Sequence, residues 1–442
     1  MPSKTKKITT SVLPGFMELL PADQILFNKM LSIIRDTYES FGFIPLDTPA
    51  IERSEVLLAK AGGETEKQIY RFSKGDNDLS LRFDLTVPLA RYVSEHFSNL
   101  TFPFRRYHIA KVYRGERPQK GRYREFYQCD IDIIGNGTLS LVNDAEILTI
   151  IYDVFKGLGL PDFKIRISNR KLINGLLKSL DLKDQAVEVM RIIDKIEKVS
   201  PKETKQNLLD IGLSKDKVEK IWEFVGIKGD VKKVLKDLAG MGQKDELFKT
   251  GLKELTEVIN YIELLGLPVS AYGLDLSIAR GLDYYTGTVY ETILEDYKEM
   301  GSVCSGGRYD NLAENYTSQK LPGVGISIGL TRLFSRLKEA GLIQSGAASP
   351  ARVLVIPFNQ EVTSAALSLG RKLRSSGLAT EVYLEEAKFK NKLSYANKLG
   401  IRYVVLVGED EIASSLWTLK DMETGKQQQL ATKELIAELK RV

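Results

Sequence analysis

Two strand-type stretches on either side of a basic loop constrain the fold of this chain more than any other feature. The first reads RRYHIAKVYR and ends at Arg114, and the second reads REFYQCDIDIIG and begins at Arg124. The segment between them holds Pro118 and Gly121, which interrupt regular structure. Because both stretches are rich in β-branched and aromatic residues, we predict an antiparallel hairpin with a long basic tip.

Alternation along the second stretch gathers polar side chains on one side of the predicted strand. Successive side chains of a strand point to opposite faces, so Cys129 falls with the apolar residues. The other face carries two carboxylates, which are costly to bury unless they are paired or hydrogen-bonded. A lone strand with this pattern is most simply solvated on that face, but two further stretches argue for a binding pocket. The polar face comprises Arg122, Arg124, Phe126, Gln128, Asp130 and Asp132.

Two stretches later in the chain combine groups suited to binding a polar ring. Within ARGLDYYTGTVYE, the eight residues RGLDYYTG contain Arg280, a carboxylate, two tyrosines and two glycines, and SGGRYDNL follows closely. Tyrosines hydrogen-bond a polar ring while packing against its faces. Gly306 and Gly307 permit a tight turn or a close approach of the backbone. Each stretch alone is typical of a turn with a packed aromatic residue, but together with the basic hairpin they indicate a ligand site.

Any nucleotide bound by this chain must have its phosphates held by side chains. The sequence has no GxxxxGK[ST] phosphate loop, and GVGISIG lacks the spacing of the dinucleotide-binding GxGxxG. A guanidinium group offers a planar, bidentate fork to phosphate oxygens. Arg114, at the end of the first strand, and Arg332, at a predicted helix start, are therefore the natural candidates.

The remaining chain divides into regions of different character. At 442 residues it is too long for a single core. Residues from about 171 to about 267 are charged and helix-periodic, which predicts a helical insertion within a first domain at 1–340. Residues 341–351 are small and polar, which predicts a linker. Beyond them apolar strands alternate with helical stretches, which predicts a separate α/β domain at 352–442.

Composition argues against several classes of protein. The two cysteines lack CxxC spacing, which indicates a reducing compartment and excludes a thiolate metal cluster, and two histidines are too few for an imidazole-based zinc site. The charged N-terminus has no apolar core behind it, so no secretory signal is predicted. No apolar run approaches ~18 residues, so we expect no membrane span. The net charge of +5 is compatible with a nucleic-acid partner but does not require one.

The motifs resemble those of the class II aminoacyl-tRNA synthetases, and most specifically those of the histidyl-tRNA synthetase family. YRGERPQKGRYREFYQCDIDIIG is similar to motif 2 of the class, GVGISIGLTRL is similar to motif 3, and FGFIPLDTPAIER occupies the place of motif 1. ARGLDYYTGTVYE and SGGRYDNL resemble the two signature stretches of the histidyl family. The similarity is collinear over nearly the whole chain. It implies an α+β fold with an antiparallel sheet flanked by helices, a helical insertion and a C-terminal α/β anticodon-binding domain.

The resemblance also implies a reaction and its partners. Histidine and ATP, the latter with Mg²⁺, would give histidyl-adenylate and pyrophosphate. The histidyl group would then pass to the 3′ end of tRNA(His) with release of AMP. The protein would be a cytoplasmic homodimer with no membrane association, no prosthetic group and no metal site of its own.

Catalytic and substrate-binding roles follow from the same resemblance. Arg114 would grip the α-phosphate of ATP, Arg332 would hold the phosphates from the other side, and Arg280 would bridge the substrate carboxylate and the α-phosphate. The residues implied to hold the substrate ammonium are Asp84, Thr86 and Gln128. Those implied to surround the imidazole are Tyr285, Tyr309 and Asp132, and Asp132 would accept a ring N–H although the family more often has the longer glutamate there.

The basic tip of the hairpin takes a second set of implied roles. Its side chains would face the acceptor end of the tRNA or the pyrophosphate. Arg124 would contact one of these anions or, as an equal alternative, would contact neither and form a salt bridge with a neighbouring carboxylate. The residues implied to contact the acceptor end are Arg117, Gln119, Lys120 and Arg122.

Three other interpretations stay open on the sequence alone. One is a regulatory paralogue of ATP phosphoribosyltransferase, a family that typically lacks the C-terminal domain and an intact RGLDYYTG stretch. Another is a synthetase for a different amino acid, which the two tyrosine-bearing stretches argue against. The third is an RNA-binding module without chemistry, in which Arg280 and Asp84 would have no purpose. Pyrophosphate exchange with each of the twenty amino acids distinguishes these interpretations.

Overall fold

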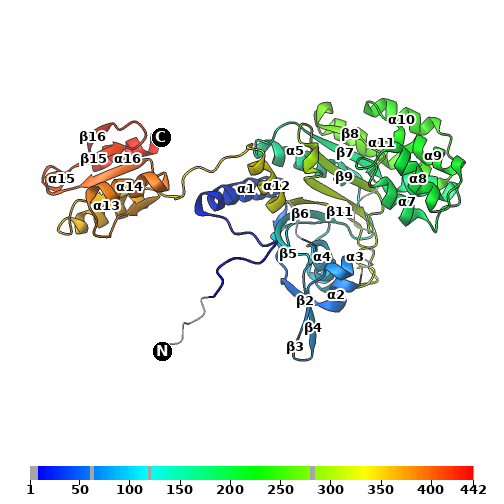
Figure 1. Ribbon diagram of the computed structural model, residues 1–442, viewed down its shortest axis with the longest axis horizontal. Helices are drawn as coiled ribbons and strands as arrows, with labels where there is room; N and C mark the ends of the chain where they lie inside the picture. The colour runs from blue at the N-terminus through cyan, green and yellow to red at the C-terminus, as the bar shows by residue number, and fades with distance from the viewer. Residues whose placement is uncertain (1–7, 60–63, 118–120, 279–283, 442) are drawn as a thin grey trace, which may run out of the picture. The chain divides into compact units, whose positions relative to one another are not determined.

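The computed structural model describes residues 8–59, 64–117, 121–278 and 284–441 (Figure 1). The chain divides into two compact units, each with its own sheet and core. The first unit takes Met1–Met17 and Ser32–Leu342, and the second takes Glu18–Leu31 and Ile343–Val442.

An eight-stranded sheet forms the centre of the first unit (Figure 1). The order across it is β1 (Ile44–Pro45), β5 (Phe104–Tyr113), β6 (Glu125–Ile134), β11 (Gly323–Gly329), β10 (Cys304–Tyr309), β9 (Thr288–Leu294), β7 (Phe163–Asn169) and β8 (Tyr272–Leu274). β1 pairs in parallel with β5, and β7 pairs in parallel with β8. Every pair between them is antiparallel, as predicted for this fold class.

The predicted hairpin is confirmed as β5 and β6. The two strands pair along their whole length, from Phe104 opposite Ile134 to Tyr113 opposite Glu125. β11 then continues the sheet, with Gly323 opposite Ile134. Directly paired residues point to the same side of a sheet. The residues of β5 and β11 that pair with the polar residues of β6 therefore lie on the same face of the sheet as they do.

Helices cover the apolar face of the sheet. Tyr38 of helix α1 (Pro21–Ser40) donates a hydrogen bond to the carbonyl of Cys129 at 3.0 Å. Tyr290 of β9 donates one to the carbonyl of Asp144 on helix α5 (Val142–Gly157) at 3.2 Å. Two more helices of the first unit are α4 (Thr86–Glu95) and α12 (Leu330–Glu339). The unit also has three short 3-10 turns, η1 (Phe97–Asn99), η2 (Val269–Ala271) and η3 (Lys298–Met300).

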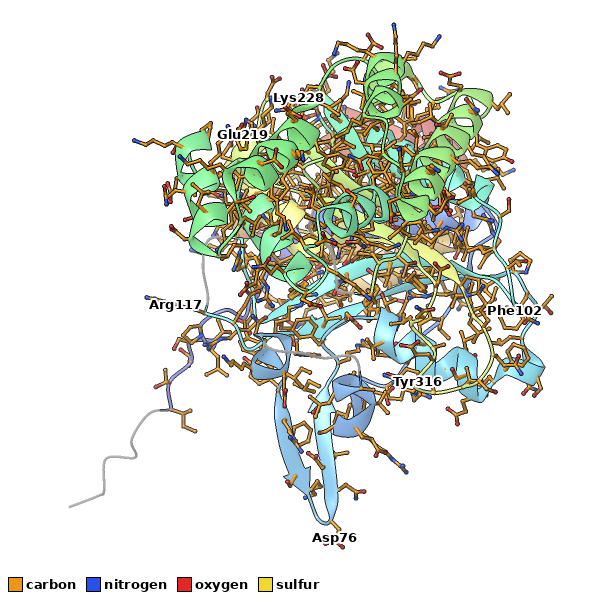
Figure 2. All side chains as sticks on the ribbon, turned by 90° about the vertical axis from the view of Figure 1, so that its right-hand side faces the viewer. Asp76, Phe102, Arg117, Glu219, Lys228 and Tyr316 are labelled. Carbon is orange, nitrogen blue, oxygen red and sulfur yellow. The ribbon has the colours of Figure 1, made fainter. Side chains whose placement is uncertain are left out.

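A small three-stranded sheet extends from the first unit. It consists of β2 (Ile51–Arg53), β4 (Asn77–Leu81) and β3 (Arg71–Lys74), in that order, with α2 (Ser54–Leu58) and α3 (Glu64–Gln68) nearby in the sequence. The β3–β4 hairpin projects away from the main sheet, with Asp76 at its tip (Figure 2).

The stretch predicted to be a helical insertion is helical. Serine and aspartate side chains cap several of the N-termini, because their oxygens accept the free N–H groups of the first turn. Ser200, Ser214, Asp230 and Asp245 each accept such a bond. The helices are α6 (Arg170–Ser179), α7 (Ala186–Ile193), α8 (Pro201–Asp210), α9 (Lys215–Gly226), α10 (Val231–Gly240) and α11 (Glu246–Leu264).

The second unit is an α/β fold around a five-stranded sheet. The order is β13 (Thr380–Val382), β12 (Val353–Pro357), β14 (Tyr403–Val407), β15 (Leu416–Asp421) and β16 (Gln427–Ala431), of which the first three are parallel. Its helices beyond residue 352 are α13 (Thr363–Ser375), α14 (Phe389–Leu399), α15 (Glu409–Ser414) and α16 (Thr432–Arg441). The sequence did not indicate α15 or β16, because α15 is short and the run QQQ in β16 has no strand propensity.

Candidate active site

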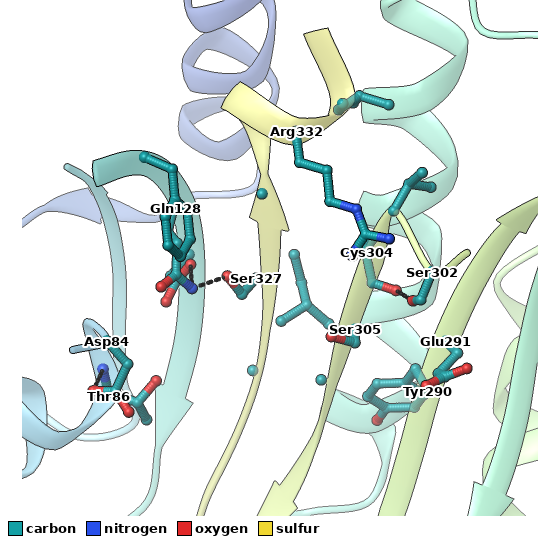
Figure 3. Close-up of a pocket in the computed structure, with 18 of the residues that line it drawn as sticks. Asp84, Thr86, Gln128, Tyr290, Glu291, Ser302, Cys304, Ser305, Ser327 and Arg332 are labelled. Atoms are coloured by element: carbon teal, nitrogen blue, oxygen red, sulfur yellow. Dashed lines mark hydrogen bonds between the residues drawn. The ribbon is translucent and has the colours of Figure 1, made fainter. Parts of the chain in front are cut away.

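A cavity of about 450 Å³ lies over the polar face of β6 and β11 (Figure 3). It is bounded by the turn before α4, by α12 and by the tyrosine-bearing loop before β9. The predicted site residues that line it are Asp84, Thr86, Arg114, Arg122, Gln128, Asp132, Tyr285, Tyr309 and Arg332. Arg280, Gln119 and Lys120 lie outside the described residues, and Arg117 is exposed (Figure 2).

Glycines on β10 and β11 let the floor of the cavity approach its side chains closely. A Cβ on Gly325 would lie 2.2 Å from Oδ1 of Asp132, and one on Gly306 would lie 2.1 Å from the Gly325 carbonyl oxygen. Side chains at these positions cannot be accommodated without displacing the strand or Asp132. Of the two possibilities for Gly306 and Gly307, the close backbone approach is confirmed, since both lie within β10 and not in a turn.

Two arginines mark the end of the cavity where α12 begins, called here the phosphate end. The guanidinium of Arg114 packs over the rings of Phe83 and Phe126, 4.4 and 5.0 Å from their centroids. Its Nε donates to the carbonyl of Phe83 at 3.3 Å. Arg332, in the first turn of α12, donates from Nη2 to the carbonyl of Met300 at 2.7 Å. Both side chains thus have defined positions facing a volume large enough for a small-molecule substrate.

A carboxylate and two polar side chains lie beside Arg114. Asp84 precedes α4, and its Oδ1 accepts the N–H groups of Thr86 at 3.2 Å and Val87 at 2.9 Å. Burial raises the pKa of Asp84, while the Val87 hydrogen bond and the charge of Arg114 oppose that rise. Gln128 donates to Ser327 Oγ at 2.5 Å (Figure 3). These oxygens suit a small ammonium group.

Asp132 lies at the other end of the cavity, called here the ring end, opposite Gly325. Its Oδ1 accepts the Tyr309 hydroxyl at 2.7 Å, and its Oδ2 lies 2.5 Å from Nη2 of Arg106. Tyr284 contacts the ring of Tyr285 edge-on at 4.9 Å and that of Tyr309 at 5.8 Å. An aromatic wall and an anionic acceptor therefore meet at this end, which suits a flat ring with an N–H donor.

Sequence reasoning missed three residues of this site. Arg106, Asp130 and Tyr284 were given no role, although Asp130 was placed on the correct face of its strand. Burial raises the pKa of Asp132 to about 6 and that of Asp130 to about 7, against the charge of Arg106. Period-two alternation could have found Asp130, but Arg106 emerges only when the register places it opposite Asp132.

The basic tip of the hairpin has contacts within the protein. Arg122 pairs with Glu116 at 3.1 Å, and Arg124 donates from Nε to the Glu116 carbonyl at 3.2 Å. Arg124 also donates from Nη1 to the carbonyl of Pro14 at 3.4 Å. Gly121 has a φ of 73°, a conformation that favours glycine, and begins the return of the chain toward α12.

The described ranges offer neither a helix suited to a membrane nor a cluster suited to a metal. No helix in 8–59, 64–117, 121–278 or 284–441 is long and apolar enough to cross a membrane. Within the same ranges, no group of three or more His, Cys, Asp or Glu residues is arranged to hold a metal ion.

Comparison with known proteins relates both units of the chain to one family of proteins. The family model described as Histidyl-tRNA synthetase matches residues 15–333, and the model described as Anticodon binding domain matches residues 352–442. The Histidine--tRNA ligase of Clostridium tetani (strain Massachusetts / E88) is 58% identical over 434 residues, which cover 98% of each chain.

Solved structures agree with the sequence relatives. The crystal structure of histidyl-tRNA synthetase from Nostoc sp. PCC 7120 matches with a TM-score of 0.90 and 41% identity, covering 98% of this chain and 100% of that one. A protein described as an ATP phosphoribosyltransferase regulatory subunit/histidyl-tRNA synthetase from Bacillus halodurans C matches with a TM-score of 0.74. At 22% identity, with 88% of this chain and 97% of that chain covered, it shares the fold.

Replacing Asp130 by asparagine is expected to stabilise the unliganded protein at pH 8 and to change its stability little at pH 4. The folded-state pKa of about 7 lies above the ordinary value of 3.8, so the wild type loses stability as pH rises through that interval. An amide does not ionise and escapes this loss. Thermal melts of Asp130→Asn at both pH values test this, with Asp76→Asn on the exposed hairpin tip as the control. An equal change at both pH values would contradict the expectation.

Proposed function

The chain belongs to the histidyl-tRNA synthetase family, and we propose that the cavity over its main sheet is where it makes histidyl-adenylate. Like the family, it activates histidine with ATP, releases pyrophosphate, and transfers the histidyl group to the 3′ end of tRNA(His) with release of AMP. One observation carries the assignment of the cavity: arginines at its phosphate end and a carboxylate with tyrosines at its ring end face a single volume.

The phosphate end is proposed to hold ATP. Arg114 grips the α-phosphate, and Arg332 holds the phosphates from the side of α12. The packing of Arg114 over two phenylalanine rings supports this role, because its fork is oriented before any ligand arrives. ATP enters as its Mg²⁺ complex, so that the ion offsets charge the arginines do not reach. If ATP–pyrophosphate exchange proceeds equally well without Mg²⁺, the proposed role of Mg²⁺ is wrong.

The middle and the ring end of the cavity are proposed to hold histidine. Asp84 pairs with the ammonium, and Thr86 and Gln128 supply further oxygens. The imidazole lies against Tyr285 and Tyr309 and donates an N–H to Asp132. An ionised carboxylate oxygen accepts more than one hydrogen bond, so Asp132 retains an acceptor position beside its bonds to Tyr309 and Arg106.

The reaction brings two anions together, and the proposed arginines lower their repulsion. An oxygen of the histidine carboxylate attacks the α-phosphorus, and the bond from that phosphorus to the β-phosphate oxygen breaks. Arg114 and Arg332 stabilise the negative charge that builds on the phosphoryl oxygens. Arg280 is proposed to lie between the carboxylate and the α-phosphate. A terminal ribose hydroxyl of tRNA(His) then attacks the histidyl carbonyl and displaces AMP.

The division of labour along the chain is also a proposal. Residues 1–340 carry adenylate formation, with 171–267 as the helical insertion, 341–351 as a linker, and 352–442 as the anticodon-binding domain. The match of the second family model to 352–442 supports the last assignment. Cutting the linker is therefore expected to spare histidine activation and to weaken tRNA charging.

We also propose a cytoplasmic homodimer formed through the motif 1 region. β1 lies at the edge of the main sheet, where Ile44 is about half exposed, and Ile51 of β2 in the small sheet is also about half exposed. Apolar side chains beside an unpaired strand edge are typical of a surface that another chain covers. Sedimentation that gives a monomer mass would contradict the dimer, and recovery of the protein with membranes would contradict the location.

Arg280→Ala should reduce histidine-dependent ATP–pyrophosphate exchange by about 100- to 1,000-fold and leave the melting temperature unchanged. Losing one preorganised cation aimed at developing charge typically has an effect of that size. Arg280→Lys should restore part of the rate, because a point charge cannot bridge two anions as a planar fork does. In the wild type, histidine alone among the twenty amino acids should support exchange. A destabilised Arg280→Ala protein with normal single-turnover chemistry would end the assignment.

Arg117→Ala should make the salt dependence of tRNA binding shallower by about one unit of slope. Arg117, Gln119, Lys120 and Arg122 are proposed to bind acceptor-end phosphates, and binding releases one fewer counterion for every phosphate that is no longer neutralised. Arg53, an exposed arginine of β2 paired with Glu55 at 3.6 Å, is the matched control. If charging declines while the slope stays constant, the tip acts on pyrophosphate or on the fold.

A further inference from the structure

Arg106 is a completely buried arginine beneath the ring end of the cavity. Its side chain has no exposed surface, and its Nη2 lies 2.5 Å from Oδ2 of Asp132. The same nitrogen donates to the carbonyl of Leu85 at 3.2 Å. Leu85 stands between Asp84 and Thr86, so one guanidinium connects the segment proposed for the ammonium with the side chain proposed for the imidazole.

Stability alone does not account for an arginine at this position. Among the described residues, Nε and Nη1 of Arg106 are buried without a hydrogen-bond partner. A buried donor left without a partner destabilises the fold, and buried ion pairs are seldom more stable than apolar side chains of similar volume. Buried polar groups that are kept at such a cost call for a functional explanation.

The carboxylates of the cavity supply that explanation. Burial raises the pKa of Asp84, Asp130 and Asp132, and the positive charge of Arg106 opposes the rise for each. Arg106 is thus the shared counter-charge of three buried acids. Other titratable or charged side chains surround this cluster. They include Tyr38 of α1, His108 of β5, Arg114 after β5, Cys129 of β6, Tyr284 and Tyr285 of the loop before β9, and Cys304 and Tyr309 of β10.

We propose that Arg106 is the positioning residue for histidine recognition: it keeps Asp132 an ionised acceptor and holds it at a fixed distance from Asp84. The proposal rests on the function proposed above, in which these two carboxylates bind the ring and the ammonium of one substrate. A carboxylate held in this way accepts the ring N–H without first losing a proton or changing its rotamer. The link to Leu85 sets the span between the two contacts, and so the length of side chain that fits.

Kinetics of pyrophosphate exchange with Arg106→Met test the proposal. KM for histidine should rise about 10- to 100-fold at pH 7, the loss expected when a charged hydrogen-bond acceptor is no longer held in place. The kcat and the KM for ATP should change far less. The raised KM should fall again between pH 7 and pH 9, because Asp132 without its counter-charge titrates about 1–3 units higher.

Two further variants separate positioning from a role in folding. Arg82 is also buried and donates to the carbonyls of Thr48 at 2.6 Å and Lys111 at 2.8 Å, but it does not line the cavity. Arg82→Met should lower the melting temperature without altering the KM for histidine or its pH dependence. Arg106→Lys keeps the charge but cannot hold both partners equally well, so it should raise the KM several-fold without the pH shift.

The outcomes distinguish this proposal from the site assignment on which it rests. If Arg106→Met lowers only the melting temperature, or if it does not fold and Arg106→Lys shows a normal KM for histidine, the positioning role is wrong. Asp132→Asn provides the reference. If that change leaves the KM for histidine unaltered, the assignment of Asp132 to the imidazole is wrong. A raised KM in Asp132→Asn beside normal kinetics in Arg106→Met contradicts the positioning role alone.

Discussion

The register of three neighbouring strands fixes the chemistry of this chain. β5, β6 and β11 pair so that Arg106, Asp132 and Gly325 form one row across the sheet. The glycine leaves room for the carboxylate, and the arginine supplies its counter-charge. A slip of one residue would turn every side chain of a strand to the opposite face and would dismantle the site. The helices that pack on the apolar face of the sheet hold the strands in this register.

Positive and negative side chains lie within one cavity. Along β6, the arginines are near its beginning and the carboxylate of Asp132 is nearer its end. Gln128 is opposite Gly329, where α12 begins and Arg332 follows, while Asp132 is four residues further along β6. A substrate with an ammonium, a carboxylate and a ring can therefore lie along the strand with its carboxylate toward the arginines. Buried acids reduce the stability of the empty protein, which is a common consequence of preorganising a site for a charged ligand.

Much of this could be predicted from the sequence, for physical reasons that differ between residues. Strand periodicity gave the hairpin and placed Gln128, Asp130 and Asp132 on one face. The missing glycine loop led to Arg114 and Arg332. Residue chemistry indicated that the tyrosines bind a polar ring, but the role of Asp84 and the position of all three beside β6 came only through resemblance, since no local pattern brings them there. Arg106 was missed because RRYHIAKVYR looks like an ordinary strand. The partners that allow Arg106 to be buried lie about twenty or more residues away in the chain.

A crystal structure with histidine and a non-hydrolysable ATP analogue tests the central claim most directly. The account predicts a ring nitrogen of histidine within about 3 Å of the Asp132 carboxylate and the ammonium at Asp84. The α-phosphate should lie between Arg114 and the histidine carboxylate. Histidine bound with its ring away from Asp132, for example toward Glu291 at the other side of the cavity, would contradict the account.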